Sequence, residues 1–102
     1  MKEKSILDEL WELVRAIPRG NVSGYGDLGR ALSRPVSGLL VGRWMASCPA
    51  DIPWWRVVGA DGRLPLWKRD ANLERIQQDR LVEEGVEFEE GRVKMEKFRY
   101  IP

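Results

Sequence analysis

The chain has 102 residues, a net charge of +1 at pH 7, a single cysteine and no histidine. This length supports one domain with a modest core, expected to span residues 1–102, and no apolar stretch is long enough to cross a membrane. Because the chain lacks histidine, it has neither the commonest general base near neutral pH nor the commonest metal ligand, so we expect no cofactor and no metal site.

Three helices are predicted in the first half of the chain. The first follows an N-cap at Ser5 and is ended by Pro18-Arg19-Gly20. The second follows an N-cap at Ser23 and runs to about residue 32, and the third runs from about residue 36 to 47. Two short helices joined by a three- or four-residue turn are the outline of a helix-turn-helix, whose second helix docks against DNA. Glycines in the second helix indicate close packing or close approach to a ligand: Gly24, Gly26 and Gly29.

The second half of the chain predicts short strands around one further helix. Residues 56–58 and 63–64 predict a strand and a return strand joined by a turn. Asp70 is expected to cap a helix over residues 71–84. Alternating apolar residues on both sides of Glu90-Gly91 predict a final hairpin, which resembles the wing of a winged-helix domain. The predicted fold is therefore mainly α with a small β-hairpin, in a single helix-turn-helix or winged-helix-like domain.

Basic residues concentrate in the middle of the chain. From Arg15 to Arg69 there are nine basic and three acidic residues, a net charge of +6, whereas the two flanks together carry −5. A basic middle between acidic flanks favours one cationic face for a polyanion. The acidic flanks are interpreted as solvated faces or, alternatively, as a docking surface for a partner.

Several segments resemble, in the same order, those of the O6-alkylguanine-DNA alkyltransferase family. Residues 53–58, Pro-Trp-Trp-Arg-Val-Val, stand where that family has its Pro-Cys-His-Arg-Val active-site motif. Three further segments resemble the entry to the family's helix-turn-helix, its recognition helix and its closing helix end: residues 19–28, 35–42 and 81–85. With tryptophan in place of the cysteine, and Lys68-Arg69-Asp70 after the pocket loop, the chain is similar to the alkyltransferase-like proteins.

The resemblance implies a pocket for a damaged base. In that family the third helix enters the minor groove and the damaged guanine is rotated into a pocket, because an O6-alkyl group inside a duplex cannot be enclosed. Tyr25 matches the tyrosine that crowds the target's phosphate and promotes this rotation. Met45, Trp54 and Trp67 match residues that line the pocket, where stacking is worth about 1–3 kcal/mol per base. Arg69 matches an arginine that contacts the base or its modified oxygen.

The resemblance also implies DNA contacts outside the pocket. The family's intercalating arginine corresponds to Leu39 here, an apolar wedge that forgoes hydrogen bonds to the orphaned cytosine, so we expect weaker or less discriminating flipping. Arg43, one turn further on, is the alternative for this role. Arg56 is also interpreted as support for the turn that holds Trp54. The expected DNA-binding residues are Tyr25, Arg34, Leu39, Arg43, Arg56 and Lys68. Arg34, Arg43 and Lys68 could instead be solvated surface charges.

The same positions predict binding without catalysis. Dealkylation needs a thiolate, usually activated by a neighbouring base, whereas Trp54 and Trp55 stand where the family has its cysteine and histidine. Cys48 lies six residues upstream of Trp54 and is expected to be a small buried or half-buried residue. The resemblance therefore implies a non-enzymatic monomer that binds double-stranded DNA containing O6-alkylguanine, bends it and presents it to nucleotide excision repair proteins.

Other interpretations remain open on the sequence. A winged-helix transcription regulator that reads undamaged DNA has the same outline, and an active alkyltransferase that uses Cys48 is a third hypothesis. Trp11 and Trp44 are expected to be core anchors rather than ligand contacts. A lone cysteine and an N-terminus unlike a signal peptide favour the cytoplasm.

Overall fold

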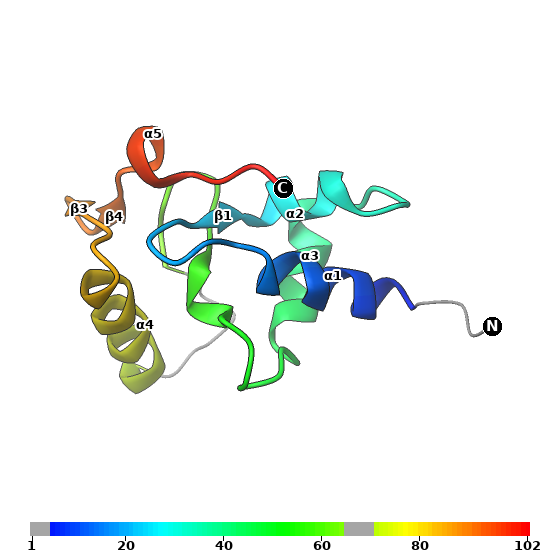
Figure 1. Cartoon of the computed structure of the whole chain (residues 1–102), viewed down its shortest axis with the longest axis horizontal. Helices are drawn as coiled ribbons and strands as arrows, with labels where there is room; N and C mark the ends of the chain where they lie inside the picture. The colour runs from blue at the N-terminus through cyan, green and yellow to red at the C-terminus, as the bar shows by residue number, and fades with distance from the viewer. Residues whose placement is uncertain (1–4, 65–70) are drawn as a thin grey trace.

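The computed structural model describes residues 5–64 and 71–102. Helices form most of its regular structure, and the strands are short (Figure 1). The elements, in chain order, are α1 (Ile6–Arg15), β1 (Ser23–Gly24), α2 (Tyr25–Ala31), α3 (Gly38–Met45), the 3-10 helix η1 (Trp54–Arg56), β2 (Val57–Val58), α4 (Ala71–Glu83), β3 (Phe88–Glu89), β4 (Arg92–Val93) and α5 (Met95–Phe98). No helix in the described ranges is both long and apolar enough to span a membrane.

Local signals place the first and fourth helices as predicted. The Asp8 amide donates to the Ser5 hydroxyl oxygen at 3.1 Å, so Ser5 is the N-cap of α1. The buried face of α1 carries Leu10 and Val14. The predicted helix over residues 71–84 is confirmed as α4, while its expected cap, Asp70, lies outside the described residues.

The second helix starts later than predicted, and Ser23 is not its N-cap. Ser23 lies in β1, and its hydroxyl donates to the Tyr100 carbonyl oxygen at 2.6 Å. Gly24 is the N-cap instead, and its amide donates to the Asp27 carboxylate at 3.0 Å. The prediction was wrong because Ser23 and Gly24 pair with β2, which holds both residues in the extended conformation.

The third helix is shorter than predicted at both ends. Ser37 is its N-cap, since the Leu40 amide donates to the Ser37 hydroxyl oxygen at 3.2 Å. The connection between α2 and α3 therefore runs from Leu32 to Ser37 and is longer than the expected tight turn. A Cβ atom on Gly29 would lie 2.3 Å from the Val36 carbonyl oxygen, which confirms close packing at this glycine.

The strands form two separate pairs. β1 and β2 are parallel, with Ser23 opposite Val57 and Gly24 opposite Val58. The predicted return strand over residues 63–64 is not formed, because β2 pairs with β1, and only the Gly59 amide reaches the Arg63 carbonyl at 2.9 Å. The predicted C-terminal hairpin is confirmed: β3 and β4 are antiparallel, and the two turn residues, Glu90 and Gly91, have positive φ of 52° and 77°.

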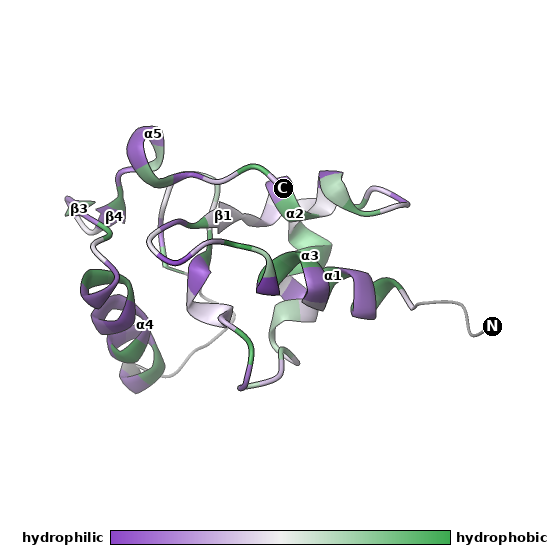
Figure 2. Cartoon of the chain, viewed as in Figure 1, coloured by the Kyte–Doolittle hydropathy of each residue, from purple (hydrophilic) through white to green (hydrophobic). Residues whose placement is uncertain are grey.

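Two groups of buried side chains form the core. The main cluster joins α1, α2, α3 and η1, and Trp11 and Trp44 are half-buried against it, close to the expected role of core anchors. The second cluster lies between β1, β2, α4 and the hairpin, and contains Val22, Val58, Leu81, Val86 and Val93. Trp55 packs against both clusters. Figure 2 shows α4 as largely hydrophilic with hydrophobic bands, as expected for a helix with one buried side.

Candidate nucleic-acid interface

One face of α3 is exposed and carries two of the predicted DNA contacts. Leu39 is 72% exposed, and Arg43 is exposed one turn further along the helix. The opposite side of α3 buries Val41 and Met45 in the main cluster. Arg34, a further predicted contact, is exposed in the connection that precedes α3. An outward face with an apolar and a cationic side chain is therefore presented on a helix whose other side is fixed in the core.

Tyr25, the first residue of α2, lies directly against α3. A Cβ atom on Gly42 would be 3.9 Å from the Tyr25 ring, and one on Gly38 would be 3.3 Å from Tyr25 Cβ. The Tyr25 side chain is half-buried, and its hydroxyl oxygen is shielded from solvent. Glycine at two successive turns of α3 thus leaves room for the ring beside the exposed face of that helix.

Three of the predicted pocket residues belong to the main cluster or pack against it. Met45 is fully buried at the end of α3, and Trp54 is 6% exposed at the start of η1. Tyr25 packs against the same cluster. The other predicted pocket residues, Trp67 and Arg69, and the predicted DNA contact Lys68 lie outside the described residues. The same cluster therefore involves predicted pocket residues from three different elements, α2, α3 and η1.

A buried carboxylate, Glu84, fixes the residues that follow Trp54. Trp55 Nε1 donates to Glu84 Oε2 at 2.8 Å, and Arg56 donates from Nε and Nη2 at 2.9 and 2.8 Å. The Gly20 amide donates to Glu84 Oε1 at 3.0 Å. Burial alone would raise the pKa of Glu84, but the hydrogen bonds from Arg56, Gly20 and Trp55 outweigh it and lower the pKa to about 2. We call Glu84, Trp55, Arg56 and Gly20 the Glu84 network.

Arg56 is engaged within the protein. Its side chain is 13% exposed, and its Nη1 also donates to the Ile17 carbonyl oxygen at 2.9 Å. This geometry agrees with the interpretation of Arg56 as support for the turn that holds Trp54. Contact between Arg56 and DNA stays a prediction.

Helix α4 supplies two further residues to this region. Gln77 is 1% exposed and donates from Nε2 to the backbone carbonyls of Trp55 and Val57, at 3.2 and 3.1 Å. The Arg80 guanidinium lies 4.6 Å from the centre of the Trp55 ring and 5.8 Å from that of Trp54. The two indoles meet edge to face, with centroids 6.0 Å apart. Sequence reasoning missed Gln77 and Arg80 because polar residues on a helix ordinarily mark its solvated face.

A second buried carboxylate, Asp27, fixes the start of α2. Arg99 donates to both of its oxygens, and Arg30 donates at 2.8 Å. The hydrogen bond from Arg99 is the largest cause that lowers the pKa of Asp27, and it acts against the effect of burial. Arg99 lies 72 residues from Asp27, so no local pattern signals the pairing. Arg99, in the C-terminal segment, thereby fixes the start of α2, where Tyr25 follows the N-cap Gly24.

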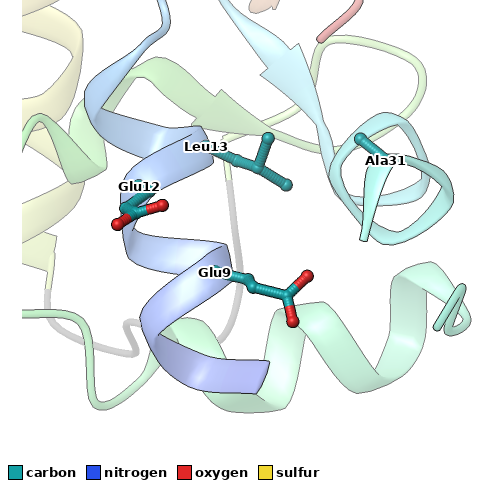
Figure 3. A pocket seen from close by; sticks show the side chains of 4 residues that line it. All are labelled: Glu9, Glu12, Leu13 and Ala31. Atoms are coloured by element: carbon teal, nitrogen blue, oxygen red, sulfur yellow. The ribbon is translucent and has the colours of Figure 1, made fainter. Parts of the chain in front are cut away.

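A depression on the outside of α1 does not fit a polyanion. It has a volume of about 480 Å³ and is lined by Glu9, Glu12, Leu13 and Ala31 (Figure 3). Glu9 accepts hydrogen bonds from the amide and hydroxyl of Ser33, at 3.0 and 2.8 Å, and so ties α1 to the connection before α3. Two carboxylates at the wall repel phosphate, and we assign this depression a structural role.

Cys48 is half-buried just beyond α3, in agreement with its predicted burial. It packs against the main cluster, which also contains Trp54. Within the described residues, no group of three or more cysteine, aspartate or glutamate side chains is placed to hold a metal ion.

Comparison with known proteins relates the whole arrangement to DNA-binding relatives. The family described as "6-O-methylguanine DNA methyltransferase, DNA binding domain" matches residues 5–86. A DNA base-flipping protein of Vibrio parahaemolyticus is 31% identical over 94% of this chain and 96% of its own. Alkyltransferase-like protein 1 of Schizosaccharomyces pombe is 36% identical over 86% of this chain and 82% of its own. The crystal structure of S. pombe Atl1 with damaged DNA containing O6-carboxymethylguanine has a TM-score of 0.82 and 30% identity, and covers 100% of both chains.

Proposed function

Because the chain belongs to the family of the 6-O-methylguanine DNA methyltransferase DNA-binding domain, we propose that it recognises O6-alkylguanine in double-stranded DNA. It rotates the damaged base out of the helix and holds it, without removing the alkyl group. The base-flipping relative and the solved complex with damaged DNA support this proposal, since both are similar to this chain over nearly its full length.

One observation carries the proposal: Tyr25, Met45 and Trp54 belong to or pack against one hydrophobic cluster, and the Tyr25 ring also lies against α3. A flipped base needs flat apolar walls close to the helix that docks on DNA. An aromatic ring at the start of α2, a flexible thioether at the end of α3 and an indole in η1 supply such walls. The Tyr25 ring lies against α3, and the exposed face of that helix, with Leu39 and Arg43, is the surface we assign to the duplex.

Binding without methyl transfer follows from the residues around Trp54. An indole offers only an N–H donor and a π face, so Trp54 cannot accept an alkyl group as a thiolate does. The Trp55 N–H is already committed to Glu84, and indole is no general base. Cys48 lies beyond the end of α3 rather than in η1. Mass spectrometry after incubation with O6-methylguanine DNA is therefore expected to give an unchanged protein mass, whereas a methyl adduct on Cys48 would contradict the proposal.

The bound lesion would then be a signal for other proteins. A protein that holds a damaged base without repairing it needs a repair activity to follow, and we assign that step to nucleotide excision repair proteins. The protein is proposed to act as a monomer in the cytoplasm, where its single thiol stays reduced.

The test is a titration of two duplexes that differ only in one guanine. Fluorescence anisotropy is expected to give tighter binding to O6-methylguanine than to guanine. In Trp54→Leu this preference is expected to fall by about 5- to 150-fold, the equivalent of losing 1–3 kcal/mol of stacking. Trp54→Phe keeps an aromatic wall and is expected to keep most of the preference, and circular dichroism checks that both variants fold. Equal affinity for the two duplexes would instead favour a winged-helix protein that reads undamaged DNA.

A further inference from the structure

Arg30 is an exposed cation that shares a buried carboxylate with a second arginine. Its side chain is 67% exposed near the end of α2, and its Nη2 donates to Asp27 Oδ1 at 2.8 Å. The Asp27 side chain is 3% exposed, and Arg99 donates to both of its oxygens as well. Two guanidinium groups and one carboxylate leave a net charge of +1 at this place.

Asp27 is held more firmly by Arg99 than by Arg30. The backbone on both sides of Arg99 is hydrogen-bonded to Val22, so this arginine has a fixed position. The hydrogen bond from Arg99 is the largest cause that lowers the pKa of Asp27, and the charge of Arg30 is the smallest. Arg30 can therefore leave the carboxylate, because the hydrogen bonds from Arg99 and from the Gly24 amide remain.

The Arg30 guanidinium lies beside the helix that we assign to the duplex. A Cβ atom on Gly26 would be 3.1 Å from Arg30 Nη1, so the guanidinium lies over this glycine. A Cβ atom on Gly38, the first residue of α3, would be 3.0 Å from the Gly26 nitrogen and 3.3 Å from Tyr25 Cβ. Both short contacts involve Gly26, so the guanidinium is close to the start of α3 and to the residue after Tyr25.

A phosphate group is the ligand that suits such a cation. A guanidinium has five N–H donors in a planar fork, and the hydrogen bond to Asp27 uses one of them. An exposed ion pair contributes little to stability, so Arg30 loses little when it exchanges a shared carboxylate for a phosphate oxygen. Phosphate contacts position a protein on the duplex. Beside Tyr25, the phosphate in question belongs to the strand whose base is rotated.

We propose that Arg30 binds a backbone phosphate of the damaged strand next to the extruded nucleotide, while Arg99 keeps the buried Asp27 neutralised. Arg30 then holds the strand whose base moves, and the affinity that it contributes is the same with and without the lesion, because a phosphate carries no base information. This inference rests on the proposed function, since the position of the phosphate is defined relative to the extruded guanine.

The first experiment measures affinity by fluorescence anisotropy with and without this cation. Arg30→Gln is expected to bind duplexes with guanine and with O6-methylguanine equally, about three- to tenfold, more weakly at about 50 mM salt. Its slope of log affinity against log salt is expected to fall by about 1, whereas Arg30→Lys keeps the charge and the slope. Arg92→Gln is the matched control and is expected to change neither quantity. Arg92 is an exposed arginine 3.7 Å from the Asp61 carboxylate, on the hairpin that Figure 1 shows away from α2.

Thermal unfolding separates the two arginines that share Asp27. Arg30→Gln is expected to change Tm by less than about 3 °C, because the exposed pair that it removes contributes little. Arg99→Gln is expected to lower Tm by about 4–8 °C, because the buried carboxylate then loses its strongest partner. A loss of affinity in Arg30→Gln without a loss of Tm is thus a loss of contact and not of fold.

The second experiment identifies the phosphate. A methylphosphonate linkage removes the charge of one phosphate, and it is introduced at one position at a time within about three nucleotides of the lesion. At one linkage of the damaged strand, the neutral group is expected to weaken the unmodified protein by about three- to tenfold and Arg30→Gln by less than about twofold. The two changes are then not additive, as expected for groups in direct contact.

Four other results would decide against the proposals. An unchanged salt slope in Arg30→Gln overturns the inference, and so does the absence of any linkage that is coupled to this residue. A slope that falls in Arg99→Gln but not in Arg30→Gln overturns it too, and names Arg99 as the phosphate ligand. Equal binding of the unmodified protein to guanine and O6-methylguanine contradicts the proposed function itself, and no substitution of Arg30 is needed to observe that failure.

Discussion

Glu84 connects three parts of the chain that are distant in sequence. It joins the loop at Gly20, the residues that follow Trp54 and the end of α4. Its side chain is 3% exposed, so its charge is tolerated only because Arg56 and two N–H donors surround it. Trp54 is therefore held in place through its neighbours Trp55 and Arg56, and through Gln77 beneath them.

Acid is expected to weaken the fold through Glu84. Its pKa is about 2 in the folded protein against an ordinary 4.5, so its stabilisation is complete above about pH 4.5 and is lost as the pH falls towards about 2. Glu84→Gln is expected to lower the free energy of unfolding near neutral pH by about 3 kcal/mol and to flatten its fall in acid. Urea titrations at several pH values measure both effects.

Glu87→Gln is the matched control for this prediction. Glu87 also has a lowered pKa, caused by hydrogen bonds from Lys97 and Lys94, but it is exposed. Exposed ion pairs contribute little because water and salt screen them, so this variant is expected to keep the acid dependence of the unmodified protein. If both variants respond alike, the Glu84 network is not the acid-sensitive part of the fold.

The contact between α2 and α3 depends on a glycine. At Gly29 a Cβ atom would meet the Val36 carbonyl, part of the backbone that leads into α3. The Val36 amide also donates to the Gly29 carbonyl at 3.1 Å, so the two segments cannot separate without losing a hydrogen bond. The distance between these helices sets where the Tyr25 ring lies against α3.

Gly29→Ala is expected to destabilise the protein by about 1–3 kcal/mol, because backbone rather than a flexible side chain must move. For a domain of this size each kcal/mol lowers Tm by about 4–8 °C, which thermal unfolding followed by circular dichroism can measure. Gly42→Ala is the matched control, since its Cβ atom would make ordinary contacts of 3.9 and 4.0 Å with the Tyr25 ring. It is expected to keep or raise Tm, and equal losses in both variants would contradict the proposed steric cause.

At the scale of the whole molecule, binding is expected to depend on salt. Phosphate contacts release counterions, so two contacts, from Arg34 and Arg43, predict a loss of affinity of about tenfold between about 50 and 200 mM salt. Arg43→Gln is expected to reduce the slope of log affinity against log salt by about 1. Arg92→Gln, on the hairpin strand β4, is expected to leave the slope unchanged. An affinity that stays flat in salt would place the DNA surface elsewhere.

The sequence predicted those parts of the fold that depend on near neighbours. The Ser5 cap, the span of α4 and the Glu90-Gly91 turn each arise from interactions within a few residues, and all are present. The parallel pairing of β1 with β2 joins residues more than thirty positions apart, and it displaced both the Ser23 cap and the return strand. Alternation and capping rules carry no information about such a partner.

In the candidate site, too, the sequence predicted the residues that belong to local motifs and missed those that act on distant residues. The motif around Trp54 and the position of Tyr25 were accessible through the resemblance of consecutive residues. Gln77, Arg80 and Arg99 were not, because each acts on a residue that is twenty or more positions away. A polar side chain that holds a distant carbonyl or ring has the same sequence signature as one that points into water.

The contacts of the C-terminal segment determine when the start of α2 can form during synthesis. Val22 exchanges hydrogen bonds with Phe98 and Tyr100, and Asp27 is bound by Arg99. The start of α2 therefore lacks its partners until residue 100 has left the ribosome, although α1, α2 and α3 emerge far earlier. Contacts of such long sequence separation form late in folding. A nascent chain that has only its DNA-facing helices is thus expected to bind DNA poorly, and to gain binding competence only after residues 98–100 have been translated.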